Sequence, residues 1–466
     1  MKNVCRAVAL ILTALGLVGL TPCRAASTVL YQFQGDTDGT WPMGRLLEYQ
    51  GELYGTTYKG GTDDYGTVFK LTPPAKGKTA WTKTTLYSFT GYTDGYDGEY
   101  PMAGLILGPG NAFYGTTNGG GLYGYGTAFK LVPPSNGQSS WSEIVIYDFC
   151  SLSECDDGSY PQDSLLEGSD GELYGTTSEG GTSINKGTVF KLTPPSGVAT
   201  KWPETVLYSF CSVGFLCDDG SHPLAELIAD RQRALYSTTE FGGANDSGTV
   251  FKLTPPAPGK TDWTETVLYS FCSTEFDSEC YDGLNPVAGL VADQQGALYG
   301  TTYIGGIPTD AFGDGTHGLV FRLSPPTNGG TEWTEIVLHQ FKSNLRGANP
   351  AATLLIGPQG VLYGTTQFGG AGHPNKGWGT VFALTPPSQG GFHWSENVLT
   401  SFNNNSSRGG QPNAGVILYQ GALYGTTKHG GQGAPASCIE VSTAGIGCGS
   451  VFAVPLPPGI GRGRTR

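Results

Sequence analysis

Short runs of β-branched and aromatic residues, separated by Gly, Pro and Asp, recur along the whole chain. In one stretch they fall at 164–167, 172–177, 187–192 and 204–210. Runs of this length between turn-forming residues are typical of strands. Their apolar residues stand in adjacent pairs, such as Val68-Phe69, rather than alternating with polar ones, so both faces of these strands should be buried. The pattern predicts four-stranded antiparallel sheets.

Composition agrees with an all-β chain. Of 466 residues, 74 are Gly and 30 are Pro, and only 14% are charged, which disfavours long helices. The chain has 24 Tyr and 21 Phe, residues that favour strands.

One motif repeats with a nearly constant spacing. The string Leu53-Tyr-Gly-Thr-Thr recurs at intervals of about sixty residues, the length of one four-stranded unit. Its tyrosines are Tyr54, Tyr114, Tyr174, Tyr236, Tyr299, Tyr363 and Tyr424. Seven repeats therefore fill the chain after its first residues.

The two ends of the repeat array distinguish a closed ring from an open solenoid. A solenoid needs atypical capping repeats. Here residues 28–33 form an isolated fourth strand, whereas residues 449–454 form a third strand with no fourth after it. Pairing the two would complete the last sheet and remove the open edges. We therefore predict a seven-bladed β-propeller over residues 26–458, closed by the N-terminal strand joining the last blade.

The N-terminus has the features of a signal peptide. Lys2 and Arg6 precede an apolar run over 7–20, and small residues before position 26 predict cleavage after Ala25. A lipoprotein or an uncleaved anchor are the alternatives. We expect a secreted or periplasmic chain, with residues 1–25 removed, no membrane segment in the mature form, and a disordered basic tail at 459–466.

Charge and cysteines extend this picture. Loss of Lys2, Arg6 and Arg24 leaves 23 basic against 39 acidic residues, a charge of −16 that disfavours nucleic acid as a partner. Eight cysteines remain in close pairs, which predict four local disulfides in an oxidising compartment. These pairs are Cys150/Cys155, Cys211/Cys217, Cys272/Cys280 and Cys438/Cys448. The pairs lack the spacing of metal ligands, and we expect no metal, no cofactor and a monomer.

The repeated Leu-Tyr-Gly-Thr-Thr, Gly-Gly and Gly-Thr-Val-Phe-Lys-Leu strings resemble the GloVer tandem repeat of bacterial secreted and surface proteins, from residue 28 to about 457. The resemblance implies a β-propeller-like repeat scaffold at or outside the cell surface. It supplies no catalytic motif.

The loop from the fourth strand of one repeat to the first strand of the next, here the inter-repeat loop, carries Asp-Gly-x-x-Pro. Asp and Gly form turns and Pro fixes the approach to a strand; a ring of carboxylates around the channel is the alternative. The aspartates are Asp38, Asp97, Asp157, Asp219 and Asp282. In the last two repeats Arg346 and Arg408 replace Asp, which would suit an anionic ligand.

Two positions vary strongly between repeats: the residue before that Pro, and the pair after Thr-Thr in the loop between the second and third strands, here the hairpin loop. Both loops are predicted on one propeller face. Their aromatic, amide and charged residues resemble a sugar-binding surface, although drift at unconstrained positions is an equal alternative. The predicted ligand-binding residues are Trp41, Tyr58, Lys59, Tyr100, Tyr160, His222, Glu240, Arg346, Arg408 and His429.

Catalytic signals are weak. Glu179 and Glu240 could act as a glycosidase pair, and His222 with Tyr160 and an arginine could serve β-elimination. Three hypotheses remain: an extracellular scaffold that binds a carbohydrate or cell-wall polymer, a secreted lyase or glycosidase that uses the same face, and a protein-interaction scaffold. Long hairpin loops at 307–316 and 432–448 are candidates to cover the central opening.

Overall fold

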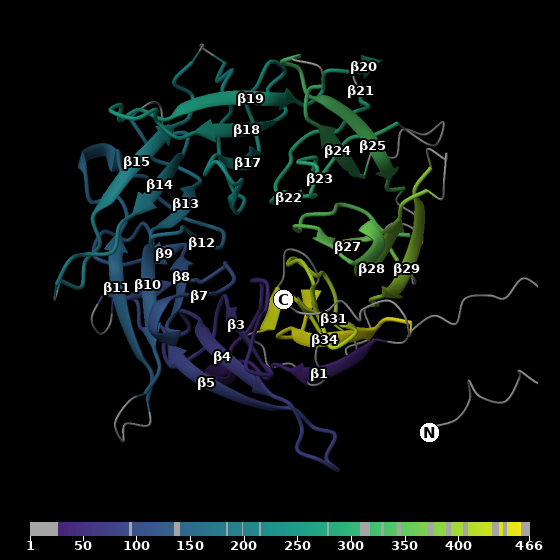
Figure 1. Cartoon of the computed structure of the whole chain (residues 1–466). Helices are drawn as coiled ribbons and strands as arrows, with labels where there is room; N and C mark the ends of the chain where they lie inside the picture. The colour runs from purple at the N-terminus through teal and green to yellow at the C-terminus, as the bar shows by residue number, and fades with distance from the viewer. Residues whose placement is uncertain are drawn as a thin grey trace, which may run out of the picture.

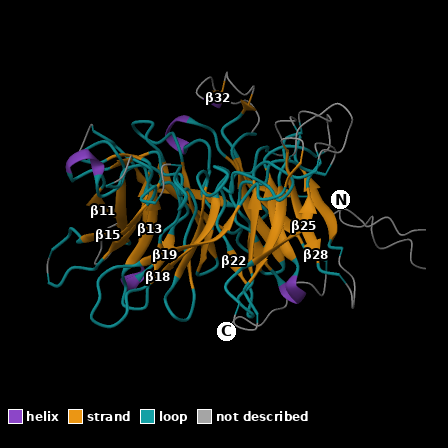
Figure 2. Ribbon diagram, turned by 90° about the horizontal axis from the view of Figure 1, so that it is seen from above, coloured by secondary structure: helices purple, strands orange, loops and turns teal. Residues whose placement is uncertain are grey.

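Seven four-stranded sheets are arranged as blades around a central axis (Figure 1). The computed structural model describes residues 27–457 apart from gaps at 93–95, 135–139, 183–184, 198, 214–215, 277–278, 308–316, 328–329, 343–345, 371–376, 388–392, 404–408, 431–437 and 441–444. The predicted signal peptide and basic tail, Arg408 and most of the two long hairpin loops lie outside the described residues. Viewed edge-on, the strands form one layer with loops on both faces (Figure 2).

Each blade runs from a short inner strand to a long outer strand, and all pairs are antiparallel. The strands of blades 1 to 4 are β2 (Leu47–Tyr49), β3 (Glu52–Thr57), β4 (Thr67–Thr72), β5 (Thr82–Ser88); β7 (Ile106–Leu107), β8 (Phe113–Thr117), β10 (Thr127–Val132), β11 (Ser142–Asp148); β12 (Leu166–Glu167), β13 (Leu173–Thr177), β14 (Thr188–Leu192), β15 (Glu204–Ser209); and β16 (Ile228–Ala229), β17 (Leu235–Thr239), β18 (Thr249–Thr254), β19 (Thr264–Ser270). Those of blades 5 to 7 are β22 (Val291–Ala292), β23 (Leu298–Thr302), β24 (Leu319–Ser324), β25 (Thr334–Gln340); β26 (Leu355–Ile356), β27 (Leu362–Thr366), β28 (Thr380–Thr385), β29 (Ser395–Ser401); and β30 (Ile417–Tyr419), β31 (Ala422–Thr427), β34 (Ser450–Pro455), β1 (Thr28–Gln32).

The remaining regular structure is small and lies in loops. Two-residue strands pair as β6 (Gly98–Glu99) with β9 (Gly119–Gly120), β20 (Glu275–Phe276) with β21 (Glu279–Cys280), and β32 (Ile439–Glu440) with β33 (Gly445–Ile446). The described loops also contain 3₁₀ turns at η1 (Asp36–Asp38), η2 (Pro109–Asn111), η3 (Ser153–Cys155) and η4 (Pro358–Gly360). Within the described ranges, no helix is long and apolar enough to cross a membrane.

The ring closes as the sequence predicts. Strand β1 pairs with β34, with Thr28 opposite Ala453 and Gln32 opposite Ser450. Just after this strand the Phe33 N–H donates to the Gly449 carbonyl at 3.0 Å. The last blade therefore takes its outer strand from residues 28–32, and both unpaired edges are removed.

A repeated phenylalanine pair joins neighbouring blades. The Phe that follows each outer strand packs edge-to-face on the Phe in the third strand of the next blade, a favourable geometry for aromatic rings. The ring centroids lie 4.9–5.2 Å apart at all seven junctions: Phe33–Phe69, Phe89–Phe129, Phe149–Phe190, Phe210–Phe251, Phe271–Phe321, Phe341–Phe382 and Phe402–Phe452. The closing junctions are packed like the others, which explains the adjacent apolar pairs in the sequence.

The inner strands are shorter than expected. In blade 3 the sequence predicts a first strand over 164–167, whereas only Leu166–Glu167 pairs with β13. The first strands meet around the axis, where Ser164 instead accepts a hydrogen bond from the backbone N–H of Gly104 in the blade before it, at 3.1 Å. Ser164 therefore joins two neighbouring blades instead of lengthening the sheet.

Candidate functional site

The inter-repeat and hairpin loops lie on one face and pair with each other. Isolated bridges join Thr40 to Lys59, Ser159 to Glu179, Ser221 to Phe241 and Gly410 to His429. In blade 2 the same contact is the β6–β9 pair. The predicted grouping of the two variable positions on one face is therefore correct.

The residue before the conserved Pro has a left-handed backbone in every blade, with φ between 52° and 59°. This conformation is unfavourable for residues other than Gly, and here two backbone hydrogen bonds hold it. Trp41 donates to the Cys448 carbonyl at 2.8 Å and accepts from Tyr58 at 3.0 Å. The same two bonds recur for Tyr100, Tyr160, His222, Asn285, Asn349 and Gln411. The backbone is fixed at these positions, whereas the side chain is free to vary.

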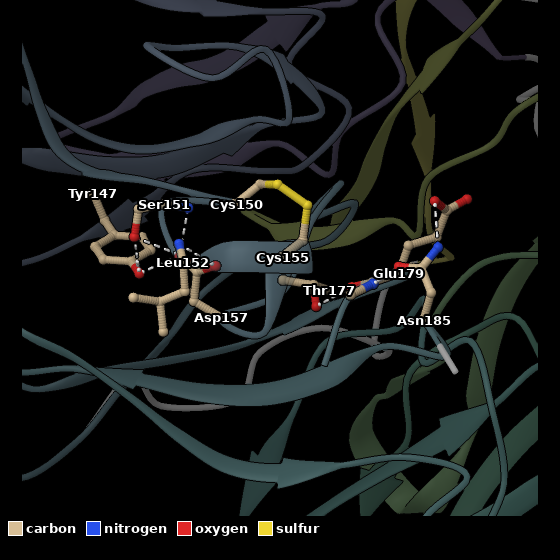
Figure 3. Close-up of a disulfide and its surroundings, with 10 residues drawn as sticks. Tyr147, Cys150, Ser151, Leu152, Cys155, Asp157, Thr177, Glu179 and Asn185 are labelled. Carbon is tan, nitrogen blue, oxygen red and sulfur yellow. Dashed lines mark hydrogen bonds between the residues drawn. A yellow bond between two sulfur atoms is a disulfide. The ribbon is translucent and has the colours of Figure 1, made fainter. Parts of the chain in front are cut away.

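The aspartates of the inter-repeat loops hold turns at the outer strands. Asp157 accepts from the Tyr147 hydroxyl at 2.6 Å, from the Ser151 N–H at 2.8 Å and hydroxyl at 2.6 Å, and from the Leu152 N–H at 3.2 Å (Figure 3). Asp97, Asp219 and Asp282 accept the corresponding tyrosine hydroxyls of the outer strands. The turn interpretation is therefore correct, and the alternative of a carboxylate ring around the channel is wrong because these groups lie against the outer strands.

Arg346 has a protein partner rather than an open anion site. Its guanidinium lies 3.2 Å from the Glu396 carboxylate in the next blade. The substitution of Asp by Arg follows a change of partner, because the tyrosine of the outer strand is replaced by His339 in blade 5 and by Thr400 in blade 6.

An aromatic and cationic cluster occupies the face over blades 7, 1 and 2; we refer to Trp41, Tyr58, Lys59, Tyr100 and Lys428 as the Trp41 cluster. The Tyr58 ring is stacked between those of Trp41 and Tyr100, with centroids 6.3 and 5.0 Å away. The Lys59 ammonium lies 5.8 Å from the Trp41 ring centre and 5.7 Å from that of Tyr100, and the Lys428 ammonium lies 5.4 Å from that of Trp41. Such distances allow cation–π attraction.

His429 packs against this cluster. Its side chain is buried and packs edge-on against Trp41 and Trp378, with centroids 6.4 and 6.1 Å away. Five of the ten predicted residues, namely Trp41, Tyr58, Lys59, Tyr100 and His429, are thus brought together. Burial raises the pKa of Tyr58, so its hydroxyl stays neutral in ordinary conditions.

The other predicted residues lie elsewhere on the face. Tyr160 packs on Tyr125 at 5.4 Å and His222 packs on Phe241 at 5.5 Å, and the charge of Glu179 acts on both side chains. Burial and the positive charge of Lys186 lower the pKa of His222, and burial raises that of Glu240.

The sequence analysis did not single out the residues that line the central channel. A cavity of about 240 Å³ lies where the three residues after each conserved Pro converge. Most of these residues are small or apolar, but Arg45, Asp163 and Glu226 are charged. Arg45 of blade 1 lies 3.2 Å from Glu226 of blade 4, and Asp163 accepts from the Glu226 N–H at 2.9 Å. Burial, followed by the charge of Glu226, raises the pKa of Asp163.

A sequence signal for these residues did exist. At the position of Asp163 the six other repeats have Gly or Ala, and at that of Arg45 and Glu226 they have Gly, Ser or Thr. Among the residues that the structure describes, no group of three or more His, Cys, Asp or Glu side chains is placed to hold a metal ion.

Comparison with solved structures finds chains of low similarity. The surface component PorZ of the type-IX secretion system of Porphyromonas gingivalis is 13% identical, with a TM-score of 0.47 over 91% of this chain and 47% of PorZ, so the chain spans about half of that protein. An ulvan lyase bound to a –[GlcA(1-4)Rha3S]– fragment is 12% identical, with a TM-score of 0.46 over 87% of this chain and 91% of the lyase. A putative glucose dehydrogenase of Thermus thermophilus is 16% identical, with a TM-score of 0.40 over 78% of this chain and 98% of that protein. Neither activity nor ligand follows from similarities of this size.

Sequence comparison assigns the family. Comparison with curated proteins finds no significant match. A model of the Gloeobacter/Verrucomicrobia repeat matches residues 16–214, 82–312 and 206–439, which overlap across most of the chain. The chain therefore belongs to the Gloeobacter/Verrucomicrobia repeat family.

Proposed function

We propose that the protein is an extracellular binding module that holds an acidic carbohydrate or cell-wall polymer through the Trp41 cluster. Export is supported by the four disulfides, Cys150–Cys155, Cys211–Cys217, Cys272–Cys280 and Cys438–Cys448, since such bonds persist in oxidising compartments.

The observation that carries the proposal is the pair of lysines over one tryptophan. The chain has a formal charge of −13, and yet Lys59 and Lys428 both place their ammonium groups within 6 Å of the Trp41 ring centre. Aromatic rings provide the apolar surface on which sugar rings pack, and ammonium groups attract carboxylates or sulfates. A polymer that carries both features fits this cluster better than a neutral glucan.

The backbone around the cluster favours binding because it is already ordered. Trp41 and Tyr58 are joined by the fixed hydrogen bonds of the seven blades, and Tyr58 is held between two rings. A rigid site loses little conformational entropy when a ligand binds.

Isothermal titration with acidic and neutral oligosaccharides tests this proposal. We expect Lys59→Ala to weaken binding of the acidic ligand by about tenfold, in line with the loss of one charged hydrogen bond. Tyr303→Ala is a matched control, because Tyr303 occupies the position of Tyr58 in blade 5 and is followed by Ile304 instead of a lysine. Equal losses in the two variants, or no loss in Lys59→Ala, would contradict the proposed site.

The channel favours one second candidate, which is cleavage of a polysaccharide. Asp163 and Glu226 provide two interacting carboxyl groups beside Arg45, and a carboxyl with a raised pKa is suited to donate a proton. Shortened products that disappear in Asp163→Asn would support this candidate over simple binding.

A further inference from the structure

At the seven blade junctions the same two positions of the repeat lie opposite each other at the rim, and their charges differ from one junction to the next. The first position is the Asp of the inter-repeat loop, which is Arg346 after blade 5; at the junction after blade 6 it is Thr400 of the outer strand. The second position lies in the outer strand of the following blade, four residues before the tyrosine of that strand or before the residue that replaces this tyrosine. The facing residues in order from the closing junction are Asp38/Lys83, Asp97/Glu143, Asp157/Glu204, Asp219/Glu265, Asp282/Glu335, Arg346/Glu396 and Thr400/Ser27.

Two junctions combine one carboxylate with a cation of the protein. The Lys83 ammonium lies 3.2 Å from the Asp38 carboxylate, and the lysine side chain is only 4% exposed. The Arg346 guanidinium lies 3.2 Å from the Glu396 carboxylate, and the glutamate side chain is only 1% exposed. A third junction is neutral, because the Thr400 hydroxyl donates to that of Ser27 at 3.1 Å. These junctions bring no excess charge to the interface between blades.

Four consecutive junctions, from blade 1 to blade 5, combine two carboxyl groups. In each of them the aspartate already accepts a tyrosine hydroxyl and at least one backbone N–H, which stabilises its charged form. The facing glutamates Glu143, Glu204, Glu265 and Glu335 each have a buried Oε1 with no hydrogen-bond partner in the described structure. Asp219 Oδ1 and Glu396 Oε1 are also buried without such a partner, but Asp219 Oδ2 accepts three hydrogen bonds and Glu396 Oε2 is paired with Arg346. A second buried negative charge without a donor is strongly unfavourable.

The surroundings of the four glutamates contain little to balance a charge. Glu204, Glu265 and Glu335 face Asp157, Asp219 and Asp282 and the hydroxyls of Tyr147, Tyr208 and Tyr269. Glu143 faces Asp97 and Asp148, and in addition the Lys201 ammonium, which is itself paired with Asp148. Burial first, and the facing aspartate second, raise the pKa of each glutamate to about 8.

We propose that a proton on each of these four glutamates stabilises its junction, as the lysine or arginine cation does in two other junctions. The junctions from blade 1 to blade 5 are therefore stabilised by protons, whereas the junction that closes the ring is stabilised by the Lys83–Asp38 ion pair. Loss of the protons at alkaline pH places two carboxylates against each other and loosens these junctions while the ring closure stays paired. This device is independent of any ligand.

The pH dependence has a definite sign. The unfolded chain ionises these glutamates near pH 4.5, whereas the folded protein retains their protons to about pH 8. The stabilisation is therefore complete below the unfolded pKa and is lost as the pH rises toward 8. Between these two pH values, each glutamate that is protonated only in the folded state makes the unfolding equilibrium constant rise by up to about tenfold for each unit of increase in pH.

Guanidinium unfolding of the mature protein from pH 5 to 8 tests the proposal. We expect stability to fall with rising pH, and we expect the combined variant Glu143→Gln, Glu204→Gln, Glu265→Gln, Glu335→Gln to lose most of this slope and to exceed the wild type at pH 8. Exposed Glu332→Gln is the control and should keep the wild-type slope. If the combined variant does not fold, the single variants are measured instead. Each of them should reduce the number of protons released on unfolding, given by the slope of the free energy of unfolding against pH, by up to one.

Two results would overturn the proposal. One is a slope that is the same in the wild type and in the glutamine variants. The other is a rise in wild-type stability at pH 8 on addition of CaCl₂ that the combined variant does not show, since a cation rather than a proton would then occupy these junctions.

Discussion

Replacement of Gly449 by Ala tests the packing that closes the ring. Gly449 has φ +97°, and an added Cβ would lie 2.6 Å from the Thr427 carbonyl oxygen and would overlap Cδ of Pro42 in blade 1. A left-handed Ala costs about 1–2 kcal/mol, and forcing a methyl group into a packed interface costs about 1–3 kcal/mol. We therefore expect a loss of about 2–5 kcal/mol in the free energy of unfolding.

Two further variants separate these contributions. Gly421 has φ +79° with no atom within 4 Å of an added Cβ, so Gly421→Ala should cost only the backbone share. Gly187 has φ +94° and meets Pro223 of the next blade at 2.6 Å, so Gly187→Ala should lose as much as Gly449→Ala if the closing junction is packed like an interior one. Equilibrium unfolding in guanidinium measures all three. Equal losses in Gly449→Ala and Gly421→Ala would refute the reasoning.

Three more variants address the loop face and the rim. Lys83→Glu creates a fifth pair of carboxyl groups against Asp38, and its loss of stability should be larger at pH 8 than at pH 5 in parallel unfolding curves. Asp157→Ala leaves the Tyr147 hydroxyl and the Ser151 N–H without their acceptor, which should lower the melting temperature through a loss of about 1–3 kcal/mol; an unchanged melting temperature would contradict the turn role. Joint replacement of Cys438 and Cys448 by Ser should cost about 2–3 kcal/mol and weaken ligand binding, because the Cys448 carbonyl holds Trp41; binding that is unaffected would separate the disulfide from the site.

The sequence contains most of the fold because each repeat carries its own strands and turns. The spare strand at 28–33 and the missing strand after 454 predict the closure that β1 and β34 form. The four cysteine pairs likewise predict the observed disulfides. Local spacing suffices for these features, because the partners are either adjacent or fixed by the period of the repeat.

The roles of single side chains are harder to predict from the sequence. From the sequence, Arg346 is predicted to bind an anionic ligand. In the structure it is paired with Glu396, which lies fifty positions later in the chain. Arg45 and Glu226 meet across the channel although 181 positions separate them. Such contacts depend on how the blades are placed around the axis, which the sequence of one repeat does not specify. A comparison of the repeats position by position would still have singled out Asp163 among Gly and Ala.

The most direct test of the proposed function is affinity electrophoresis of the protein from residue 26 onward and of its Trp41→Ala variant. Both are run through gels that contain an acidic polysaccharide, with a neutral polysaccharide as reference. The account predicts that the acidic polymer retards the wild type, that Trp41→Ala migrates almost as in an empty gel, and that the neutral polymer has little effect on either protein. Equal retardation of both proteins, or none for the wild type with any acidic polymer, would contradict binding through the Trp41 cluster.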